Sequence, residues 1–401
     1  MSAPGRPQRE SLPGQAVAQR QEGAPRRILL FIHSLHGGGA ERVAADLSAR
    51  WAQEGREVTV VTQAGPQGDA YALHPRVRRV VLDTAGASGG GWRGVLANLR
   101  RLRALRRLIA RERPDIVLGM MTTASVLAVL AGWGLPCRVI ATEHTHPPSQ
   151  RLGRAWGWLR RAAYPRAARV VALTAGTARW LETHVPGSRL AVIPNAVHWP
   201  LPSGEPALAP PAPGRHILLA VGRLHPDKGF DLLLDAYARL APGFPDWDLV
   251  LLGEGGERAR LQDAIARAGL DARVVMPGRA GNVGDWYARA DLYVLSSRVE
   301  GLSNTLLEAM ACGLAPVAFD CETGPREIVR HGVDGLLVRP AGDPAALAVA
   351  LESLMRDAAG RRKLAAEATS VRERFAMERI LARWQNVFDQ AMGGCTRSVD
   401  E

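Results

Sequence analysis

Two glutamates lie eight positions apart in one short segment, where both can accept hydrogen bonds from a single ligand. Glu300 and Glu308 lie within SSRVEGLSNTLLEAMACG, residues 296–313. A short apolar run precedes this segment, so Glu300 is expected in a loop after a buried strand, whereas Glu308 lies in the helix that begins at Asn304. A loop carboxylate suits sugar hydroxyls and a helix carboxylate suits a ribose diol. The unpaired N–H groups near Ser303 suit the phosphates between them.

The whole segment resembles the E-x7-E signature of retaining glycosyltransferases, family 4 in particular. The match includes the glycine after the first glutamate and the Glu-Ala-Met-Ala-Cys-Gly ending. Two bare carboxylates would equally fit an ordinary loop and a solvated helix face, but the flanking residues favour the signature. The resemblance implies that Glu300 orients the donor sugar in catalysis. It also implies that the nucleotide is bound by Leu302, Ser303, Asn304 and Glu308.

Length and composition fit a globular protein of about two domains. The chain has 401 residues, of which 47% are hydrophobic and 22% charged. Residues 1–26 are rich in Pro, Gly, Gln and Arg without an apolar core, so we expect a disordered leader, no signal peptide and a cytoplasmic protein. The four cysteines never form Cys-x-x-Cys, which indicates reduced thiols and neither a zinc site nor a disulfide framework. They are Cys137, Cys312, Cys321 and Cys395.

The formal charge of +12 is concentrated in two segments. Residues 92–113 carry eight arginines and one acid, with apolar residues at helical spacing. Residues 151–169 carry six arginines, no acid, and the aromatic residues Trp156, Trp158 and Tyr164. Such helices fit the inner face of an anionic membrane, and they fit equally well a domain whose arginines form a solvated face. Nucleic acid is not expected as a partner, because no motif that binds it accompanies the charge.

Strand-like apolar runs alternate with helical segments in two blocks, which predicts parallel sheets covered on both faces. Seven prolines between residues 194 and 214 break the pattern. We therefore expect an α/β protein with two Rossmann-like, doubly wound domains facing a central cleft, the GT-B fold that the family resemblance also implies. Residues 344–390 are expected to be continuous helix apart from Gly360. The predicted divisions are a leader (1–26), an acceptor domain (27–195), a linker (196–214), a donor-nucleotide domain (215–375), a helix crossing back to the first domain (376–392) and a tail (393–401).

A glycine-rich turn follows the first predicted strand, in the segment HGGGAER at residues 36–42. Glycines without Cβ let the backbone approach a ligand where a helix begins. Beside the other motifs, this turn resembles the family's GGAER-type loop, which implies that Gly38 and Gly39 approach donor phosphate and acceptor. It does not fit a dinucleotide fingerprint, because Thr62 and Gln63 stand where an acidic residue is expected.

The matching turn in the second block carries two cations that can converge on one diphosphate. Arg223 follows a predicted strand, and Lys228 precedes a helix that starts at Gly229. An arginine offers a fork of donors and a lysine offers a point charge. The resemblance implies that Arg223 and Lys228 neutralise the leaving nucleotide without a metal. In relatives, the loops at Gly253 and at Gly278 lie beside the nucleotide base and ribose, but in isolation both also fit ordinary turns. The candidate residues of this region are Gly222, Gly253, Gly278 and Arg279.

Histidine and metal chemistry are the least specific signals. His144 follows a strand, and the resemblance implies contact with the donor sugar, although a lone histidine is more often a satisfied polar group. No His-x-x-x-His spacing or Asp-x-Asp motif is present, so we expect neither a metal nor a cofactor.

The sequence therefore predicts a retaining, metal-independent glycosyltransferase. It would move a sugar from a nucleotide-diphosphate donor to a hydroxyl of a glycan or polyprenyl-diphosphate-linked acceptor in bacterial surface polysaccharide synthesis. Residues 321–328, CETGPREI, resemble members that use UDP-N-acetylhexosamines, although Glu322 departs from the usual Pro or Ser. The alternatives are a sugar-nucleotide epimerase of the same architecture, or a family 4 transferase that uses GDP-mannose or UDP-glucose.

Overall fold

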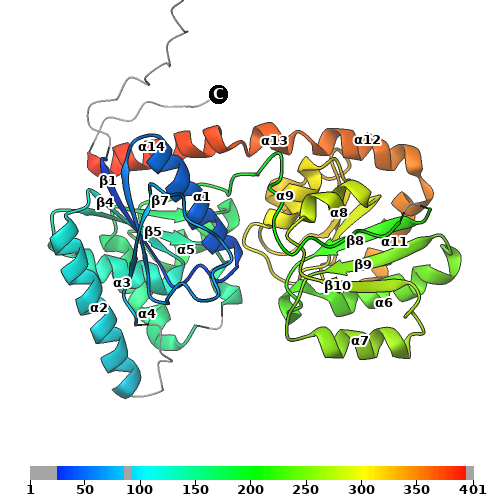
Figure 1. Ribbon diagram of the computed structural model, residues 1–401, viewed down its shortest axis with the longest axis horizontal. Helices are drawn as coiled ribbons and strands as arrows, with labels where there is room; N and C mark the ends of the chain where they lie inside the picture. Colours follow the sequence, from blue (N-terminus) through cyan, green and yellow to red (C-terminus); the bar gives the residue numbers. More distant parts are fainter. Residues whose placement is uncertain (1–24, 85–91, 151, 213, 394–401) are drawn as a thin grey trace, which may run out of the picture.

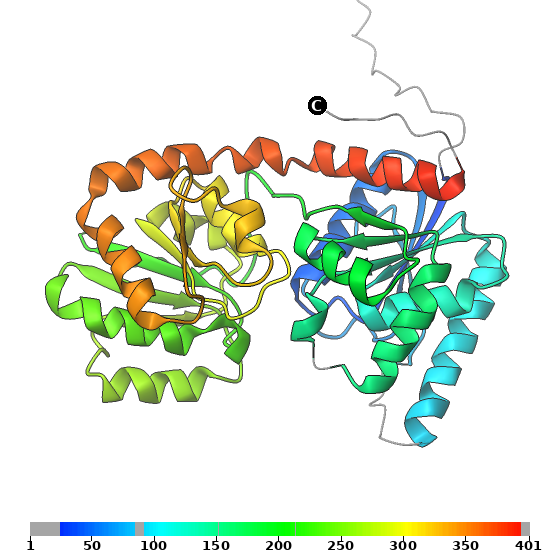
Figure 2. The same ribbon diagram turned by 180° about the vertical axis from the view of Figure 1, so that it is seen from behind.

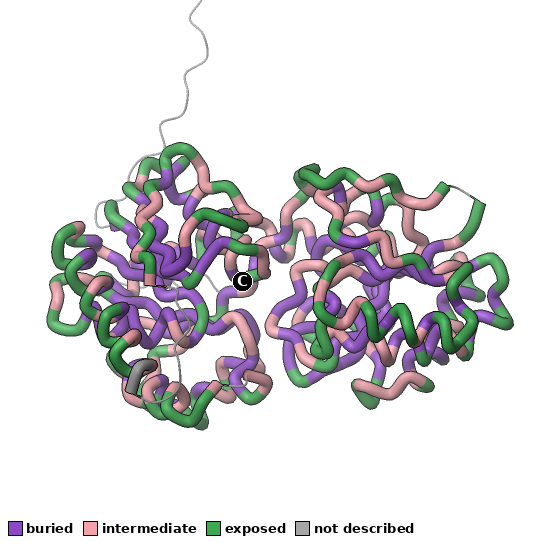
Figure 3. Tube along the Cα trace, turned by 60° about the horizontal axis from the view of Figure 1, so that its bottom comes forward, coloured by how far each residue is buried: buried purple, intermediate pink, exposed green. Residues whose placement is uncertain are grey.

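The computed structural model describes residues 25–84, 92–150, 152–212 and 214–393, apart from the side chains of Trp92 and Arg93. The predicted leader and tail lie almost wholly outside these residues. Two α/β domains stand side by side, and the C-terminal helices run along one edge of both (Figures 1 and 2). Each domain has its own buried core (Figure 3).

The first domain is built on a parallel sheet with the strand order β3-β2-β1-β4-β5-β6-β7. Its strands are mostly buried runs of Val, Ile and Leu, as expected when helices cover both faces. The strands are β1 (Arg27–Ile32), β2 (Glu57–Thr62), β3 (Arg78–Val81), β4 (Ile116–Met120), β5 (Arg138–Glu143), β6 (Arg169–Ala172) and β7 (Leu190–Val192).

Alternate residues of β1 face different helical layers, because side chains on a strand alternate between the faces of a sheet. Leu29 and Phe31 pack with α2–α5, whereas Leu30 and Ile32 pack with α1 and the last helix of the chain. The helices and turns of this domain are α1 (Gly39–Gln53), α2 (Trp92–Glu112), α3 (Thr122–Gly132), η1 (Pro147–Ser149), α4 (Arg154–Ala163), η2 (Tyr164–Arg166) and α5 (Ala175–His184).

The second domain repeats this plan with the parallel strand order β10-β9-β8-β11-β12-β13. Its strands are β8 (His216–Val221), β9 (Trp247–Leu252), β10 (Val274–Gly278), β11 (Leu292–Leu295), β12 (Pro316–Phe319) and β13 (Leu336–Val338). Its helices and turns are η3 (Pro226–Lys228), α6 (Phe230–Leu240), η4 (Ala241–Gly243), α7 (Arg258–Arg267), α8 (Val283–Arg289), α9 (Asn304–Ala311) and α10 (Pro325–Ile328).

Both sheets reverse their strand order once, between β1 and β4 and between β8 and β11. Loops that leave neighbouring strands in opposite directions open a crevice at the carboxyl ends of the strands, where ligands of such sheets bind. The glycine turn follows β1, Arg223 follows β8, and Glu300 follows β11. The topology thus brings the predicted site residues to the facing edges of two doubly wound sheets, and the predicted fold class is confirmed.

The prediction of continuous helix over residues 344–390 is wrong. The segment forms α11 (Pro344–Arg356), α12 (Ala358–Ala368), α13 (Val371–Arg374) and α14 (Met377–Met392). The first break lies at Asp357, whose carboxylate accepts the Gly360 N–H at 2.9 Å and so caps α12. Gly360 therefore lies inside the first turn of α12 and does not interrupt a helix.

The last helix, α14, belongs to the core of the first domain. The rings of Trp384 and Phe388 lie 5.8 and 5.2 Å from that of Trp51 on α1. The proline-rich linker is also held in place, since Val197 N–H donates to the Phe375 carbonyl and Asn282 exchanges hydrogen bonds with the Leu208 backbone. No helix in the described ranges is both long and apolar enough to span a bilayer.

Candidate active site

Lys228 and Glu300 meet at the crevice of the second domain. The Lys228 ammonium lies 2.5 Å from Glu300 Oε1, and Ser297 Oγ donates to the same oxygen at 2.6 Å. Lys228 ends η3, and the next residue, Gly229, has a φ of 61°, which turns the chain into α6. Arg223 is exposed near the end of β8, and no ion pair engages it within the described ranges. Lys228 and the buried Glu300 thus meet where the sequence predicts a diphosphate and a sugar, and Arg223 lies on the same loop as Lys228, after β8.

The beginning of α9 faces the first domain. Ser303 caps the helix by accepting the Leu306 N–H, and its neighbour Asn304 accepts a hydrogen bond from Asn195 at 2.8 Å. The glycine turn lies on the other side of Asn304: a Cβ added to Gly39 would be 3.3 Å from the side-chain Nδ2 of Asn304. Leu302, just before the cap, is buried. The predicted phosphate-binding helix end therefore lies beside the predicted glycine loop.

Glu308 is buried and joins the two domains through a partner that sequence reasoning missed. Arg42 of α1 donates to Glu308 Oε1, and Tyr287 donates to Oε2 at 3.2 Å. Burial alone would lower the pKa of Arg42, but the carboxylates of Glu308 and Asp46 hold that pKa above its usual value. The sequence signal for this contact was Arg42 itself, the last residue of the HGGGAER segment, which lies in the first turn of α1.

Gly222, Gly253 and Gly278 come together at the carboxyl ends of β8, β9 and β10. Gly253 has a φ of 151°, and a Cβ there would lie 1.9 Å from the Gly222 carbonyl oxygen, so only glycine fits. Its N–H donates to the Gly278 carbonyl at 2.8 Å. Arg279 follows and is exposed. Across the crevice lies Tyr71. Burial raises the pKa of its hydroxyl, and the positive charges of Arg42 and Arg279 oppose that rise.

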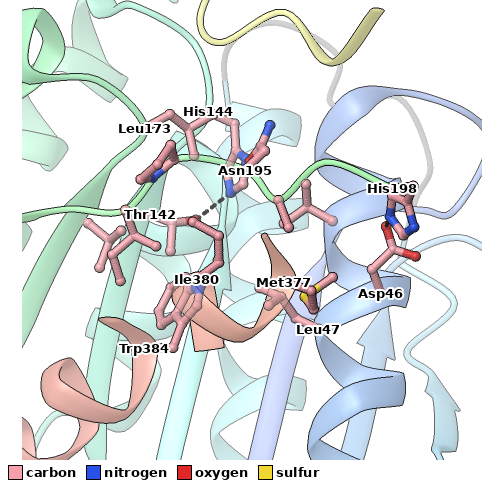
Figure 4. A pocket seen from close by; sticks show the side chains of 15 residues that line it. Asp46, Leu47, Thr142, His144, Leu173, Asn195, His198, Met377, Ile380 and Trp384 are labelled. Carbon is pink, nitrogen blue, oxygen red and sulfur yellow. Dashed lines mark hydrogen bonds and ion pairs between the residues drawn. The ribbon is translucent and has the colours of Figure 1, made fainter. Parts of the chain in front are cut away.

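His144 lies on the first domain's side, above a small cavity. Its Nε2 is 3.0 Å from Thr142 Oγ1, and burial lowers the pKa of the imidazole to about 4, so the ring is neutral near pH 7. The cavity, about 20 Å³, has room for about one water molecule and is also lined by Asn195 and Trp384 (Figure 4). Contact between His144 and a donor sugar stays a prediction.

A second buried group at this edge, Glu143, was not anticipated. Thr122 donates to its Oε2 at 2.7 Å and Tyr164 to its Oε1 at 2.6 Å, while Arg160 lies 3.6 Å away. Burial raises the pKa of Glu143, although these hydrogen bonds and the arginine oppose the shift. The signal was a carboxylate at the end of a buried strand. Near the end of β5 the first domain thus carries a buried carboxyl group that accepts from protein hydroxyls and, beside it, a neutral imidazole.

Residues 321–328, the segment whose sequence suggests the donor, make contacts with other parts of the protein. Glu327 accepts the N–H groups of Ala175 and Gly176, each at 3.0 Å, and so caps α5 of the other domain. Arg326 donates to Asp320 at 2.8 Å. Across the same interface, Glu322 lies 3.1 Å from His146 Nε2. Glu327 and Glu322 thus contact the first domain, whereas Arg326 pairs within the second.

No cluster of three or more His, Cys, Asp or Glu side chains that could hold a metal ion occurs among the described residues.

Comparison with known proteins finds one family model for each of the two domains. The family model "Glycosyltransferase Family 4" matches residues 37–198, and "Glycosyl transferases group 1" matches residues 209–371. A D-inositol 3-phosphate glycosyltransferase of Thermobispora bispora is 32% identical over 67% of this chain and 68% of its own. The chain belongs to the family 4 glycosyltransferases.

Two other relatives of this glycosyltransferase differ in how much of their own length it matches. An alpha-1,4-N-acetyl-D-galactosaminyltransferase of Campylobacter jejuni, which acts on a diNAcBac-PP-undecaprenol-linked glycan, is 26% identical over 89% of this chain and 97% of its own. An exopolysaccharide phosphotransferase of Streptomyces coelicolor is 37% identical over 68% of this chain, which spans only 28% of that protein's length.

Solved structures share the fold of the glycosyltransferase. Sucrose-phosphate synthase from Thermosynechococcus elongatus has a TM-score of 0.80 at 20% identity and covers 91% of this chain and 99% of its own. Anabaena HepE in complex with UDP has a TM-score of 0.73 at 21% identity over 89% and 98% of the two chains. The GT-B architecture is therefore shown over nearly the whole described molecule.

Proposed function

We propose that this glycosyltransferase is a retaining, metal-independent enzyme that transfers an N-acetylhexosamine from UDP to a hydroxyl of a glycan or polyprenyl-diphosphate-linked acceptor in bacterial surface polysaccharide synthesis. The observation that carries the proposal is the contact of Lys228 with the buried Glu300 at the carboxyl end of the second sheet, with the exposed Arg223 on the same loop as Lys228. A bound donor would exchange the Lys228–Glu300 pair for two new contacts, phosphate with the ammonium and sugar hydroxyl with the carboxylate.

In the transfer step, the bond between sugar C1 and the diphosphate oxygen breaks, and its electron pair leaves with UDP. The acceptor oxygen forms the new bond to C1 from the same face, and its proton passes to the departing diphosphate. Negative charge develops on the leaving oxygen, so Lys228, Arg223 and the N–H groups at the start of α9 stabilise the transition state without a metal. Glu300 and His144 orient the sugar.

The donor assignment rests on the family resemblance of residues 321–328 and on the named activity of the Campylobacter relative. UDP itself is supported by the Anabaena structure, which holds that nucleotide on the same fold. The alternatives are GDP-mannose or UDP-glucose as donor, and epimerisation of a sugar nucleotide.

Thermal shift separates these nucleotides, because a ligand that binds only the native state raises its apparent stability. UDP should stabilise the protein, and GDP and ADP should not; selective stabilisation by GDP would instead indicate mannose transfer. A donor screen that follows nucleotide release then identifies the sugar, with chelator present to test for a metal. Conversion of the UDP-sugar into an isomer without acceptor would identify an epimerase.

We also propose that the first domain lies on the inner face of an anionic membrane. The second half of α2 packs into the core through Leu105, Leu108 and Ile109, but Val95, Leu96 and Leu99 in its first half are exposed. Trp158 on α4 is 69% exposed, and both helices cover the same face of the sheet. Exposed apolar and aromatic side chains among arginines suit the headgroup level of a bilayer. The arginines of these two helices that face solvent include Arg100, Arg103, Arg107, Arg154 and Arg161.

Vesicle sedimentation tests this attachment. Each basic residue near an anionic surface contributes roughly 1 kcal/mol, and salt screens the attraction over about 8 Å at physiological ionic strength. The protein should sediment with anionic vesicles at low salt and be released at high salt. Protein that stays in the supernatant at low salt would favour a soluble acceptor.

A further inference from the structure

We propose that the first domain carries a second anion site, remote from the crevice, which binds a phosphate-bearing ligand. It is a cavity of about 360 Å³ lined by four arginines, which we call the arginine cavity: Arg138, Arg166, Arg169 and Arg189. None of its other lining residues is acidic; they include Trp133, Cys137 and Gln390.

The sheet itself places these cations together. Arg138 and Arg169 are the first residues of β5 and β6, and Arg189 directly precedes β7. These three strands are parallel neighbours in the sheet, so their amino ends lie along one edge. Arg166 comes from η2 just before β6. The active site uses the carboxyl ends of the strands, so the arginine cavity lies at the opposite edge of the domain.

The other half of the same edge shows how this protein usually balances such charge. Arg27 at the start of β1 lies 3.1 Å from Glu57 at the start of β2. Arg78 at the start of β3 pairs with Glu112 at the end of α2. By contrast, no carboxylate in the described residues forms an ion pair with any arginine of the arginine cavity. Four like charges around one cavity repel each other, and an anion between them would relieve that repulsion.

One hydrogen-bond donor in the arginine cavity also lacks an acceptor. Arg169 Nε is buried without a hydrogen-bond partner, which is costly unless a ligand supplies one. Arg166 instead stacks over the ring of Trp133, at 5.1 Å, and donates to the Ala162 carbonyl. Guanidinium groups match phosphate through paired N–H donors, so a phosphate or diphosphate is the ligand class that fits. The cavity is within the size range of small-molecule sites.

Calorimetric titration with inorganic tripolyphosphate tests the site, with UDP present at saturation to block the crevice. Wild-type protein should bind one tripolyphosphate. Arg169→Gln and Arg189→Gln should each weaken binding on the order of tenfold, because each removes a charged donor. Arg50→Gln, at an exposed arginine on α1, is the matched control and should not change the affinity. Arg189 is exposed, so its variant keeps the test valid if Arg169→Gln misfolds.

A vesicle arm separates the two sources of phosphate. If the ligand is a lipid headgroup, Arg189→Gln should reduce sedimentation with phosphatidylglycerol vesicles, and tripolyphosphate should compete with them. If the ligand is a free phosphate compound, the variant should lose tripolyphosphate binding and keep its vesicle binding. The proposal is overturned if tripolyphosphate does not bind beside UDP, or binds all variants equally. Stabilisation by UDP and nucleotide release do not depend on this site, so its failure leaves the proposed transfer activity untouched.

Discussion

The two domains share one topology but place different chemistry at the crevice. The second domain presents charge that a ligand can use: Arg223 is exposed, and Lys228 contacts Glu300. Near the end of β5 the first domain instead carries Glu143, which accepts from protein hydroxyls, and His144, whose lowered pKa keeps it neutral. A charged leaving group needs cations, whereas an acceptor hydroxyl needs shape and neutral hydrogen bonding. The difference predicts that substitutions in the second domain reduce nucleotide binding and transfer, whereas substitution of Glu143 or His144 in the first domain leaves nucleotide binding unchanged.

The largest expected effect is that of Lys228→Ala on transfer. The loop should keep its fold, but loss of a cation at the developing negative charge should cost about 2 to 4 kcal/mol of transition-state stabilisation. Steady-state kinetics measure this as kcat/KM. The other lysine of the chain, Lys363, is exposed on α12 and offers a matched control. Equal rates for Lys228→Ala and Lys363→Ala would remove Lys228 from the mechanism.

Glu143→Ala should show the opposite pattern. It removes the acceptor of the buried Tyr164 hydroxyl and the carboxylate beside the buried Arg160, whereas Thr122 still donates to Gln150 at 2.9 Å. These losses should lower the free energy of unfolding by about 2 to 3 kcal/mol. UDP affinity should not change. Urea titration measures the loss, and Glu352→Ala, at a partly exposed ion pair on α11, should cost far less. A stable Glu143→Ala protein that no longer binds UDP would contradict the comparison.

His144 should make stability depend on pH. Its pKa is about 4 in the folded protein, below the ordinary value of 6.5, so the unfolded chain binds a proton first as pH falls. The free energy of unfolding should therefore drop between pH 7 and pH 5, by about 2 kcal/mol from this group. His144→Gln should flatten that part of the profile. The prediction fails if wild-type and variant profiles run parallel.

The smallest effect should come from the contact between the domains. Glu327→Gln keeps the shape of the α5 cap but removes its charge, which should weaken the contact between the domains by about 1 kcal/mol. We expect kcat/KM to fall about fivefold with little change in melting temperature. Activity equal to wild type would show that transfer does not depend on this contact.

Local patterns were enough to predict the fold and the edge of each sheet where the candidate site's loops lie. Alternating strands and helices imply parallel sheets, and such sheets bring the loops at Gly39, Arg223 and Glu300 to their carboxyl ends. The partners across the crevice could not be predicted, because Arg42 and Glu308 are 266 positions apart and meet only when the domains pack. The break at Asp357 was missed for a different reason: a local side-chain cap, and not the apolar periodicity, decides where α12 begins.

Calorimetric titration of UDP into Lys228→Ala and His144→Gln tests the central claim most directly. UDP carries the diphosphate but no sugar, so it reports only on the charge of the second domain. We predict that Lys228→Ala weakens UDP binding more than tenfold, as expected for a lost contact with a charged group, and that His144→Gln binds UDP like the wild type. Normal UDP affinity in Lys228→Ala, or its loss in His144→Gln, would contradict the assignment of the nucleotide to the second domain.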